Sequence, residues 1–284
     1  MKPKFDEETE NMDIKWKCDL ERSVIFETME ERGWEESSDE PNWNFYWIAA
    51  TQIKRLFQPT AKNPLSKKQI ANHFQNHYEL TRKDLMAKNI RKYQRENARE
   101  SVTLVSGEKV CLQAEIIPLT LNLPAEHALF MEEFLKNPNR QWIFKPAGKS
   151  QGSGISLITK ISQARNLPSY ISSLRTQVAY LAEHFLISRY IEGPLLLNGR
   201  KFDLRLYVLV TSYKPLKVWK YQEGFARVCF EQYSNSKTED PNKALFGHLT
   251  NVSFQKNSAA YNDVHGGKFP LSALLLFLEL NYGH

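Results

Sequence analysis

The sequence predicts a mixed α/β (α+β) fold, and three kinds of pattern carry that prediction. Residues 141–160 contain two short apolar runs around a Gly-rich loop, which is typical of a strand–loop–strand hairpin. Residues 199–212 alternate charged and apolar side chains with the period of two that a strand requires. Residues 81–99 and 125–140 instead show the apolar spacing of helices.

The loop of the predicted hairpin has the composition of a phosphate-binding loop. Gly152 and Gly154 let the backbone approach a ligand closely, Lys149 adds positive charge, and Gln151 is a further polar side chain. The loop sequence matches neither a Walker loop nor a Rossmann loop. Each of those loops is followed by a helix, whereas the residues after this loop resemble a strand. The pattern leaves two interpretations open: a phosphate loop, or an exposed turn with ordinary lysines.

Composition narrows the class of protein. The 284 residues, with 42% hydrophobic and 25% charged residues, can form one large or two modest domains. The three cysteines are too far apart for a disulfide framework or a CxxC metal site. No apolar run approaches the roughly 20 residues of a membrane helix, and the acidic N-terminus is unlike a secretory signal. We therefore expect a soluble intracellular protein without a membrane partner.

The net charge of +6 is unevenly distributed. Residues 1–40 carry a net charge of −8 and the remainder +14, which favours an anionic partner such as nucleic acid, an acidic protein tail or nucleotide phosphates. Residues 82–99 contain seven basic and two acidic side chains, and Lys88, Lys92, Arg95 and Arg99 fall near one face of the predicted helix. We predict that this helix docks an acidic partner; the alternative is an ordinary solvated face.

The first third of the chain predicts short elements around aromatic residues. Residues 16–34 predict a strand and an amphipathic helix that ends near Gly33. The apolar face of this helix would consist of Val24, Ile25, Met29 and Phe26. Residues 42–50 predict a core strand. His73, Asn76 and His77 predict a polar loop rather than a metal site, because no third ligand stands at a defined spacing.

The basic helix is expected to begin at Thr81 as N-cap, with Asp84 in its first turn. Its core-facing side chains would be Leu85, Met86, Ile90 and Tyr93.

Later segments predict the charged face of a strand and several loops. Residues 161–182 predict a helical crossover, and residues 184–194 a strand that ends at Gly193-Pro194. Lys201, Asp203 and Arg205 share one face of the strand at 199–212, and the following YVLV predicts burial. A hairpin turning at Glu223-Gly224, a polar HLTN cluster, a Gly-Gly-Lys turn and a C-terminal helix complete the prediction.

Nine segments in order resemble the tubulin tyrosine ligase-like family of ATP-grasp amino-acid ligases. They are NFYW, NHYELTRKD, WIFKP, QGSGI, SRYIEGP, GRKFDLRLYV, EGFAR, HLTN and GGK, between about residues 15 and 279. The first two are most similar to polyglutamylase members related to the catalytic subunit of the tubulin polyglutamylase complex. The resemblance implies an ATP-grasp fold with a leader (1–14), an N-terminal subdomain (15–124), a central subdomain (125–192) and an incomplete C-terminal subdomain (193–284).

The resemblance also implies roles for individual residues. The nucleotide would be held by Lys145, Gln151, Gly152, Gly154, Ser188, Arg189, Tyr190, Ile191, Lys201, Asp203, Thr250 and Asn251. Arg205, Arg227 and Lys268 would be catalytic, with Arg205 near the transferred phosphoryl group. Arg227 and Lys268 would bind the incoming amino acid, with Ser253 nearby, and Lys88, Lys92 and Arg95 would bind the protein substrate.

The implied reaction uses ATP and Mg²⁺. A carboxylate on a tubulin tail attacks the γ-phosphate, and the amine of free L-glutamate then attacks the acylphosphate so formed and displaces phosphate. Implied partners are tubulin or microtubule tails and accessory polyglutamylase subunits, with no nucleic acid. The implied location is the cytoplasm and cytoskeleton, including the cilium or flagellum and basal bodies.

Two departures from the family pattern keep alternatives open. Ser153 stands where many relatives have a basic residue, and the chain ends in LELNYGH without the LKPWLLEVN-like text that supplies Mg²⁺ ligands. Asp263 and Glu279 lack the surroundings to replace them. We therefore expect a truncated form of the family. The alternatives are a non-catalytic tubulin- and nucleotide-binding protein, a tubulin glycine ligase, and a nucleic-acid binder, for which no helix-turn-helix, zinc or RRM signature is present.

Overall fold

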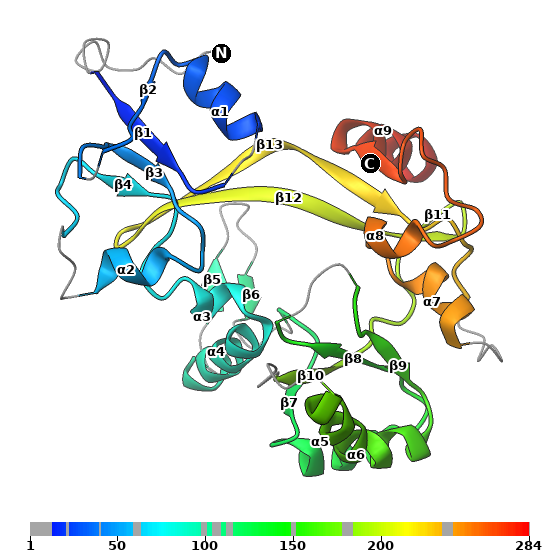
Figure 1. Ribbon diagram of the computed structural model, residues 1–284. Coiled ribbons are helices and arrows are strands. Elements are labelled where there is room, and N and C mark those ends of the chain that lie inside the picture. The colour runs from blue at the N-terminus through cyan, green and yellow to red at the C-terminus, as the bar shows by residue number, and fades with distance from the viewer. Residues whose placement is uncertain are drawn as a thin grey trace. The chain divides into compact units, whose positions relative to one another are not determined.

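The structure, a computed structural model, describes residues 13–20, 23–39, 41–58, 64–97, 101–103, 109–111, 116–148, 152–177, 184–234 and 241–283. The chain divides into two compact units, residues 1–81 and 82–284 (Figure 1). The first contains a parallel sheet and the second contains antiparallel sheets with helices. The predicted mixed α/β fold is confirmed.

The first unit is built on four short parallel strands in the order β2-β1-β3-β4. The strands are β1 (Lys15–Cys18), β2 (Glu35–Glu36), β3 (Phe45–Trp47) and β4 (Ile70–Ala71), and the helices are α1 (Ser23–Glu30), α2 (Ile53–Phe57) and α3 (Tyr78–Thr81). Trp43, Tyr46, Ile48 and Ile53 form a buried cluster. The predicted core strand at 42–50 is confirmed.

Helix α1 ends as the sequence predicts, but part of its predicted apolar face is wrong. Gly33 has a φ of +69° and its N–H donates to Glu30 O at 2.8 Å, so a glycine suits this position. Phe26 packs edge-on against Trp16 at 5.0 Å between ring centroids, and Met29 is buried. Val24 is instead 62% exposed.

The start of the basic helix differs from the prediction. Helix α4 spans Lys83–Glu96 with Arg82 at its N-cap position, whereas Thr81 ends α3 and its hydroxyl donates to His77 O. Thr81 is therefore not the N-cap, because its hydroxyl is already bonded within the preceding turn. Asp84 does lie in the first turn of α4.

The predicted core face of α4 is wrong at Tyr93, which is 46% exposed, while Asp84 and Ala87 are the buried residues of the helix. A short antiparallel pair, β5 (Ser101–Thr103) and β6 (Lys109–Cys111), follows α4 in the chain.

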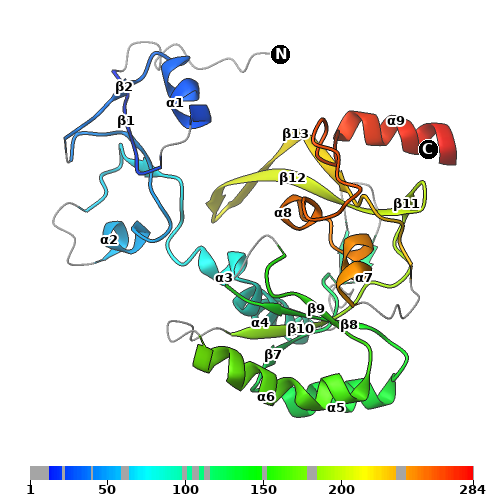
Figure 2. The same ribbon diagram turned by 45° about the vertical axis from the view of Figure 1, so that its right-hand side comes forward.

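The second unit contains an antiparallel sheet in the order β7-β10-β8-β9. Its strands are β7 (Thr120–Leu123), β8 (Trp142–Pro146), β9 (Ser156–Ile158) and β10 (Phe185–Arg189), and its helices are α5 (His127–Lys136) and α6 (Ile161–Gln177). Both helices lie along one face of the sheet (Figure 2). The predicted hairpin at 141–160 is confirmed as β8 and β9, and the two predicted helices are confirmed as α5 and α6. The strand predicted at 184–194 is present but shorter: β10 ends at Arg189 and not at Gly193-Pro194.

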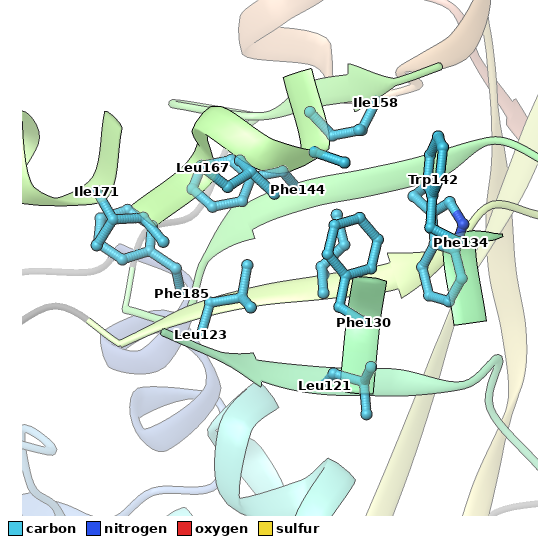
Figure 3. Close-up of a cluster of buried hydrophobic side chains, with 12 residues drawn as sticks. Leu121, Leu123, Phe130, Phe134, Trp142, Phe144, Ile158, Leu167, Ile171 and Phe185 are labelled. Atoms are coloured by element: carbon cyan, nitrogen blue, oxygen red, sulfur yellow. The ribbon is translucent and has the colours of Figure 1, made fainter. Parts of the chain in front are cut away.

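Aromatic residues dominate the core between this sheet and its two helices (Figure 3). Phe144 and Phe185 stack on neighbouring strands with 5.2 Å between their centroids, and Phe130 of α5 meets Trp142 edge-on at 5.1 Å. Each such side chain buries a large apolar area, so this layer is the main source of stability in the unit.

A second sheet in the order β11-β12-β13-β14 carries the long strands. They are β11 (Leu196–Leu197), β12 (Arg200–Tyr213), β13 (Leu216–Val228) and β14 (Lys268–Pro270), and the remaining helices are α7 (Pro241–His248), α8 (Val252–Gln255) and α9 (Leu271–Tyr282). Among the described residues, no helix has the length and apolar character needed to cross a membrane.

Two predictions for the long hairpin are wrong. The chain reverses at Lys214-Pro215, and Gly224 lies inside β13, where a Cβ would stand 2.5 Å from the Arg205 carbonyl oxygen. The glycine therefore permits close approach of two strands rather than a turn. The YVLV segment is not buried: Tyr207 and Leu209 are 50% and 62% exposed, because β14 pairs with only the last part of β13.

The packing of the core predicts that two apolar residues of α5 contribute very differently to the free energy of unfolding. Phe130→Ala is expected to lower the free energy of unfolding by about 3–5 kcal/mol, because it leaves a cavity among fully buried rings. Leu135→Ala, at a position 59% exposed, is expected to change it by less than about 0.5 kcal/mol. Urea unfolding of both variants measures the difference, and equal effects would contradict the described packing.

Candidate functional site

The sheet β7-β10-β8-β9 presents polar residues on the face opposite its aromatic core. Side chains alternate along each strand, so Phe144 and Phe185 point toward α5 and α6 while Lys145 points away. Lys145 lies opposite Leu186 on β10, and Ser188 lies opposite Thr120 on β7. The Thr120 and Ser188 hydroxyls are 2.9 Å apart. This face, and not the core face, can bind a ligand.

A pocket of about 280 Å³ opens on this polar face. It is lined by Lys83, Met86, Ala87, Ile117, Pro118, Thr120, Ile143, Lys145, Leu186, Ser188, Arg189, Tyr190, Ile191 and Lys201. Six residues predicted from the sequence are therefore brought together: Lys145, Ser188, Arg189, Tyr190, Ile191 and Lys201. The lining combines an apolar slot with three lysines and includes no carboxylate, which suits a flat apolar group that bears negative charge.

Two lysines of the pocket, Lys145 and Lys201, are poorly solvated, and Lys83 lies close to Lys145. Burial, together with the charge of Lys83, lowers the pKa of Lys145 below its usual range. Burial also lowers the pKa of Lys201. Lys83 donates to the carbonyl of Ala147 at 3.4 Å, at the start of the Gly-rich loop. An anion in the pocket would relieve this cation repulsion.

Arg82 and Asp84 hold the first turn of α4, from which Lys83 projects. The guanidinium donates two hydrogen bonds to the carboxylate, at 3.1 Å and 2.7 Å. The position of Lys83 at the pocket thus depends on a local ion pair.

A buried polar network adjoins the pocket. The Lys201 ammonium donates to the Tyr190 hydroxyl at 2.7 Å, and this hydroxyl lies 2.7 Å from Nδ1 of His248. Burial and the charge of Lys201 lower the pKa of His248 to about 4, so the imidazole is neutral at pH 7. The phenol is close to the polar end of the pocket.

Charged residues form a row across the second sheet. In register, Asp203 of β12 lies opposite Arg227 of β13, which lies opposite Lys268 of β14. Arg227 donates to both oxygens of Asp203, at 2.8 Å and 2.5 Å, and this raises the pKa of Arg227. Lys201 and Arg205 share the same strand face two residues to either side of Asp203. The predicted charged face is therefore present, with Asp203 already paired.

The Gly-rich loop meets the predicted HLTN segment. A Cβ on Gly152 would lie 3.4 Å from Oδ1 of Asn251, and one on Gly154 would lie 3.0 Å from Pro146. Asn251 is the N-cap position of α8, Thr250 is buried, and Ser253 is exposed. Gln151 and Lys149 lie outside the described residues.

Gln255 anchors the HLTN segment through the hydrogen bonds of its side chain. Its side chain accepts from Phe230 N at 2.9 Å and donates to the carbonyls of Phe246 and Leu249 at 2.7 Å and 2.6 Å. Because Gln255 is only 1% exposed, water cannot replace these bonds.

A second, larger pocket of about 960 Å³ lies between α4 and β7. Lys88, Arg91 and Arg95 line it, and Arg91 pairs with Glu126 at 2.8 Å. Lys92 is not among its lining residues and lies 3.9 Å from Glu96. Of the three predicted docking cations, the structure thus brings Lys88 and Arg95 together, with Arg91 as an addition.

The described residues offer no cluster of three or more His, Cys, Asp or Glu side chains that could hold a metal ion. Asp203 is engaged by Arg227, and His73 and His77 stack at 4.5 Å without a third ligand. The residues present in the described part therefore do not fit a Mg²⁺ site.

Sequence reasoning missed two residues at the site. Lys83 gave no signal, because its approach to Lys145 depends on how α4 packs over the sheet. His248 did give a signal, since it belongs to the polar HLTN cluster, but its partner Tyr190 lies 58 residues away in the chain.

Comparisons with known proteins agree with the resemblance. The sequence profile described as Tubulin-tyrosine ligase family matches residues 61–281. The chain is 45% identical over 274 residues to "Probable alpha-tubulin polyglutamylase Ttll1" of Tetrahymena thermophila, which covers 95% of this chain and 66% of that protein. It is 33% identical over 296 residues to "Probable tubulin polyglutamylase TTLL9" of Rattus norvegicus, covering 95% and 62%. It is 36% identical over 245 residues to "Tubulin polyglutamylase TTLL5" of Homo sapiens, covering 84% and 16%.

The chain thus spans about two thirds of the length of Ttll1 and less of the other two relatives.

Gln255 provides a test of the HLTN anchor. Gln255→Leu leaves two buried carbonyls and one N–H without partners, so the free energy of unfolding should fall by about 2 kcal/mol or more. Lys256→Ala, at the exposed next position, should change it by less than about 0.5 kcal/mol. Thermal or urea unfolding compares them, and a Gln255→Leu protein as stable as the control would show that these bonds contribute little.

Proposed function

The chain belongs to the tubulin-tyrosine ligase family, and on this premise we propose that it is the ATP-binding part of a glutamate ligase acting on tubulin. The reaction adds glutamate to glutamate side chains of tubulin C-terminal tails. The observation that carries the proposal is the pocket with three lysines, an apolar slot and no carboxylate in its lining. The family implies use of ATP and Mg²⁺.

We assign each part of the nucleotide to a part of the pocket. The base would lie in the apolar slot beside Ile191 and Met86, where the strand-end backbone at Ser188–Ile191 can recognise it. Lys145 and Lys83 would receive the phosphates, under the loop that contains Gly152 and Gly154. Lys201 would hold the sugar or phosphate end. Because the described residues offer no cluster that could hold Mg²⁺, the phosphate charge in this part of the site would be met by the lysines.

The catalytic contribution of these residues is positioning and charge. A tubulin carboxylate attacks the γ-phosphate, and Arg205, two residues beyond Asp203 on the same strand face, is the cation suited to the transferred group. The amine of glutamate then attacks the acylphosphate carbon, and phosphate leaves. No covalent bond to the protein is needed, so orientation within the pocket supplies much of the rate.

The amino-acid substrate fits the charged row of the second sheet. Lys268 lies beside Arg227 in register, and the pair with Asp203 leaves one guanidinium nitrogen, Nη1, available to a substrate carboxylate. Two cations at this point favour a dicarboxylic amino acid over glycine. Ser253 and Asn251 are the nearby polar side chains that we assign to orientation.

The acidic tail fits the second pocket. Lys88, Arg91 and Arg95 present a basic wall there. Polyanionic tails bind such surfaces by charge, without a fixed conformation. Tubulin as substrate places the protein at the cytoskeleton, including cilia or flagella.

The proposed function is tested by nucleotide binding and by transfer of labelled glutamate to tubulin. Lys145→Ala should weaken ATP binding by about tenfold or more and abolish transfer, because it removes a charge-assisted bond to phosphate. Lys136→Ala on α5 is the matched control, since that lysine pairs with Glu132 and Glu133 on the helix. A chain that binds ATP and tubulin but transfers no glutamate would overturn the ligase assignment and favour a binding protein.

The docking pocket makes a separate prediction about salt. Lys88→Glu and Arg95→Glu should each weaken microtubule co-sedimentation several-fold at low salt, and the difference from wild type should vanish near 1 M salt, where screening acts over about 3 Å. Lys136→Glu serves as the control of equal charge change. Microtubules stripped of their acidic tails should not distinguish the variants. If the variants still bind stripped microtubules more weakly than wild type does, the acidic tail does not bind at this pocket.

A further inference from the structure

His248 is a buried titratable residue that the proposed chemistry does not use. It is 5% exposed and does not line the pocket, yet its Nδ1 lies 2.7 Å from the hydroxyl of Tyr190, which does. The ring also bonds to the backbone of Ser234 and stacks edge-on against Tyr190 and Tyr233. The imidazole thus has a hydroxyl partner at Nδ1 and a backbone partner at Ser234.

The direction of each hydrogen bond follows from what the groups can donate. An ammonium has no lone pair, so Lys201 donates to the Tyr190 oxygen. The phenol proton must then go to another acceptor, and the unprotonated Nδ1 of a neutral His248 is at hydrogen-bond distance. The side chain of Tyr190 also bonds to that of Tyr233. The chain of donors therefore runs from Lys201 through Tyr190 to His248.

The position of the Lys201 ammonium is fixed by this chain. It lies 4.5 Å from the centre of the Tyr190 ring as well as 2.7 Å from its hydroxyl, so it contacts both the ring and the hydroxyl of one phenol. Without an acceptor at Nδ1, the hydroxyl would be free to turn its proton toward the lysine and repel it. A flexible four-carbon side chain gains most from such a restraint.

We propose that His248 is a positioning residue of the nucleotide pocket: as a hydrogen-bond acceptor it orients the Tyr190 hydroxyl, which holds the Lys201 ammonium in place for the ligand. The inference rests on the proposed function for the identity of that ligand, ATP, and on the hydrogen-bond geometry alone for the restraint on Lys201. Acting through Tyr190, His248 needs no contact with the nucleotide.

Two substitutions of similar polarity separate this role from simple packing. His248→Asn puts an amide oxygen near the place of Nδ1 and keeps an acceptor for Tyr190. His248→Gln reaches instead toward the place of Nε2, keeps a partner for Ser234, and leaves Tyr190 without its acceptor. Tyr190→Phe removes the hydroxyl from the ring.

Calorimetric titration of the full chain with ATP gives the first measurement. His248→Gln and Tyr190→Phe should each weaken ATP binding about tenfold, and His248→Asn by less than about threefold. The double variant His248→Gln/Tyr190→Phe should bind no more weakly than Tyr190→Phe, because both changes break the same chain. The proposal would be overturned if the losses of ATP-binding free energy were additive in the double variant. Equal losses of affinity in His248→Asn and His248→Gln would also overturn it.

The second measurement needs no nucleotide. The acetylation rate of Lys201 by a succinimidyl ester, followed by peptide mass spectrometry and referred to Lys136, reports how firmly the ammonium is held. It should rise several-fold in His248→Gln and Tyr190→Phe and stay near wild type in His248→Asn. An unchanged rate in His248→Gln would refute the restraint. A wild-type chain that does not bind ATP, with the acetylation pattern as expected, would instead refute the proposed function and leave the restraint supported.

Discussion

The stacking of Phe144 on Phe185 is the constraint on which the site depends. These rings lie on paired strands and are both buried against α5 and α6, so they fix which residues of β8 and β10 face the core. A slip of one residue would bury Lys145 and expose Phe144, at a large cost in free energy. The register that satisfies the aromatic core therefore also points Lys145 and Ser188 toward the pocket.

The pocket concentrates positive charge where little water can reach it. Lys83, Lys145 and Lys201 are brought together by three different elements, α4, β8 and β12, and the lining contains no carboxylate to balance them. Desolvated like charges disfavour the empty site, and an anionic ligand removes that penalty. On the neighbouring sheet the positive charge is partly balanced, because Asp203 already neutralises Arg227. Lys268 lies beside this ion pair.

Local patterns in the sequence were sufficient for much of this arrangement. The glycines of the 141–160 hairpin, the period of two at 199–212 and the apolar spacing at 125–140 each depend on nearby residues, and the structure confirms all three. The errors arose where distant contacts decide. Gly224 resembled a turn residue but accommodates the backbone of Arg205, and YVLV resembled a core strand although little of the second sheet covers it.

The site residues also divide into those indicated by the sequence and those whose contacts depend on distant parts of the chain. The resemblance implied ligand-binding roles for Lys145, Tyr190 and Lys201, and these residues do line one pocket. It did not reveal that Asp203 and Arg227 bind each other, that Arg91 reaches Glu126, or that Lys83 approaches Lys145. Each of these depends on elements that are far apart in the chain and meet only in the folded unit.

The two pockets of the second unit have part of their walls in common. Ala87, Ile117, Pro118 and Thr120 line both of them; the lysines lie in the lining of one pocket and Arg91 and Arg95 in that of the other. Occupants of the two pockets are therefore thermodynamically linked wherever either displaces this partition. Whatever factor one ligand imposes on the affinity of the other, the second imposes the same factor in return. These four shared residues would thus couple the affinity of one pocket for its ligand to the occupancy of the other.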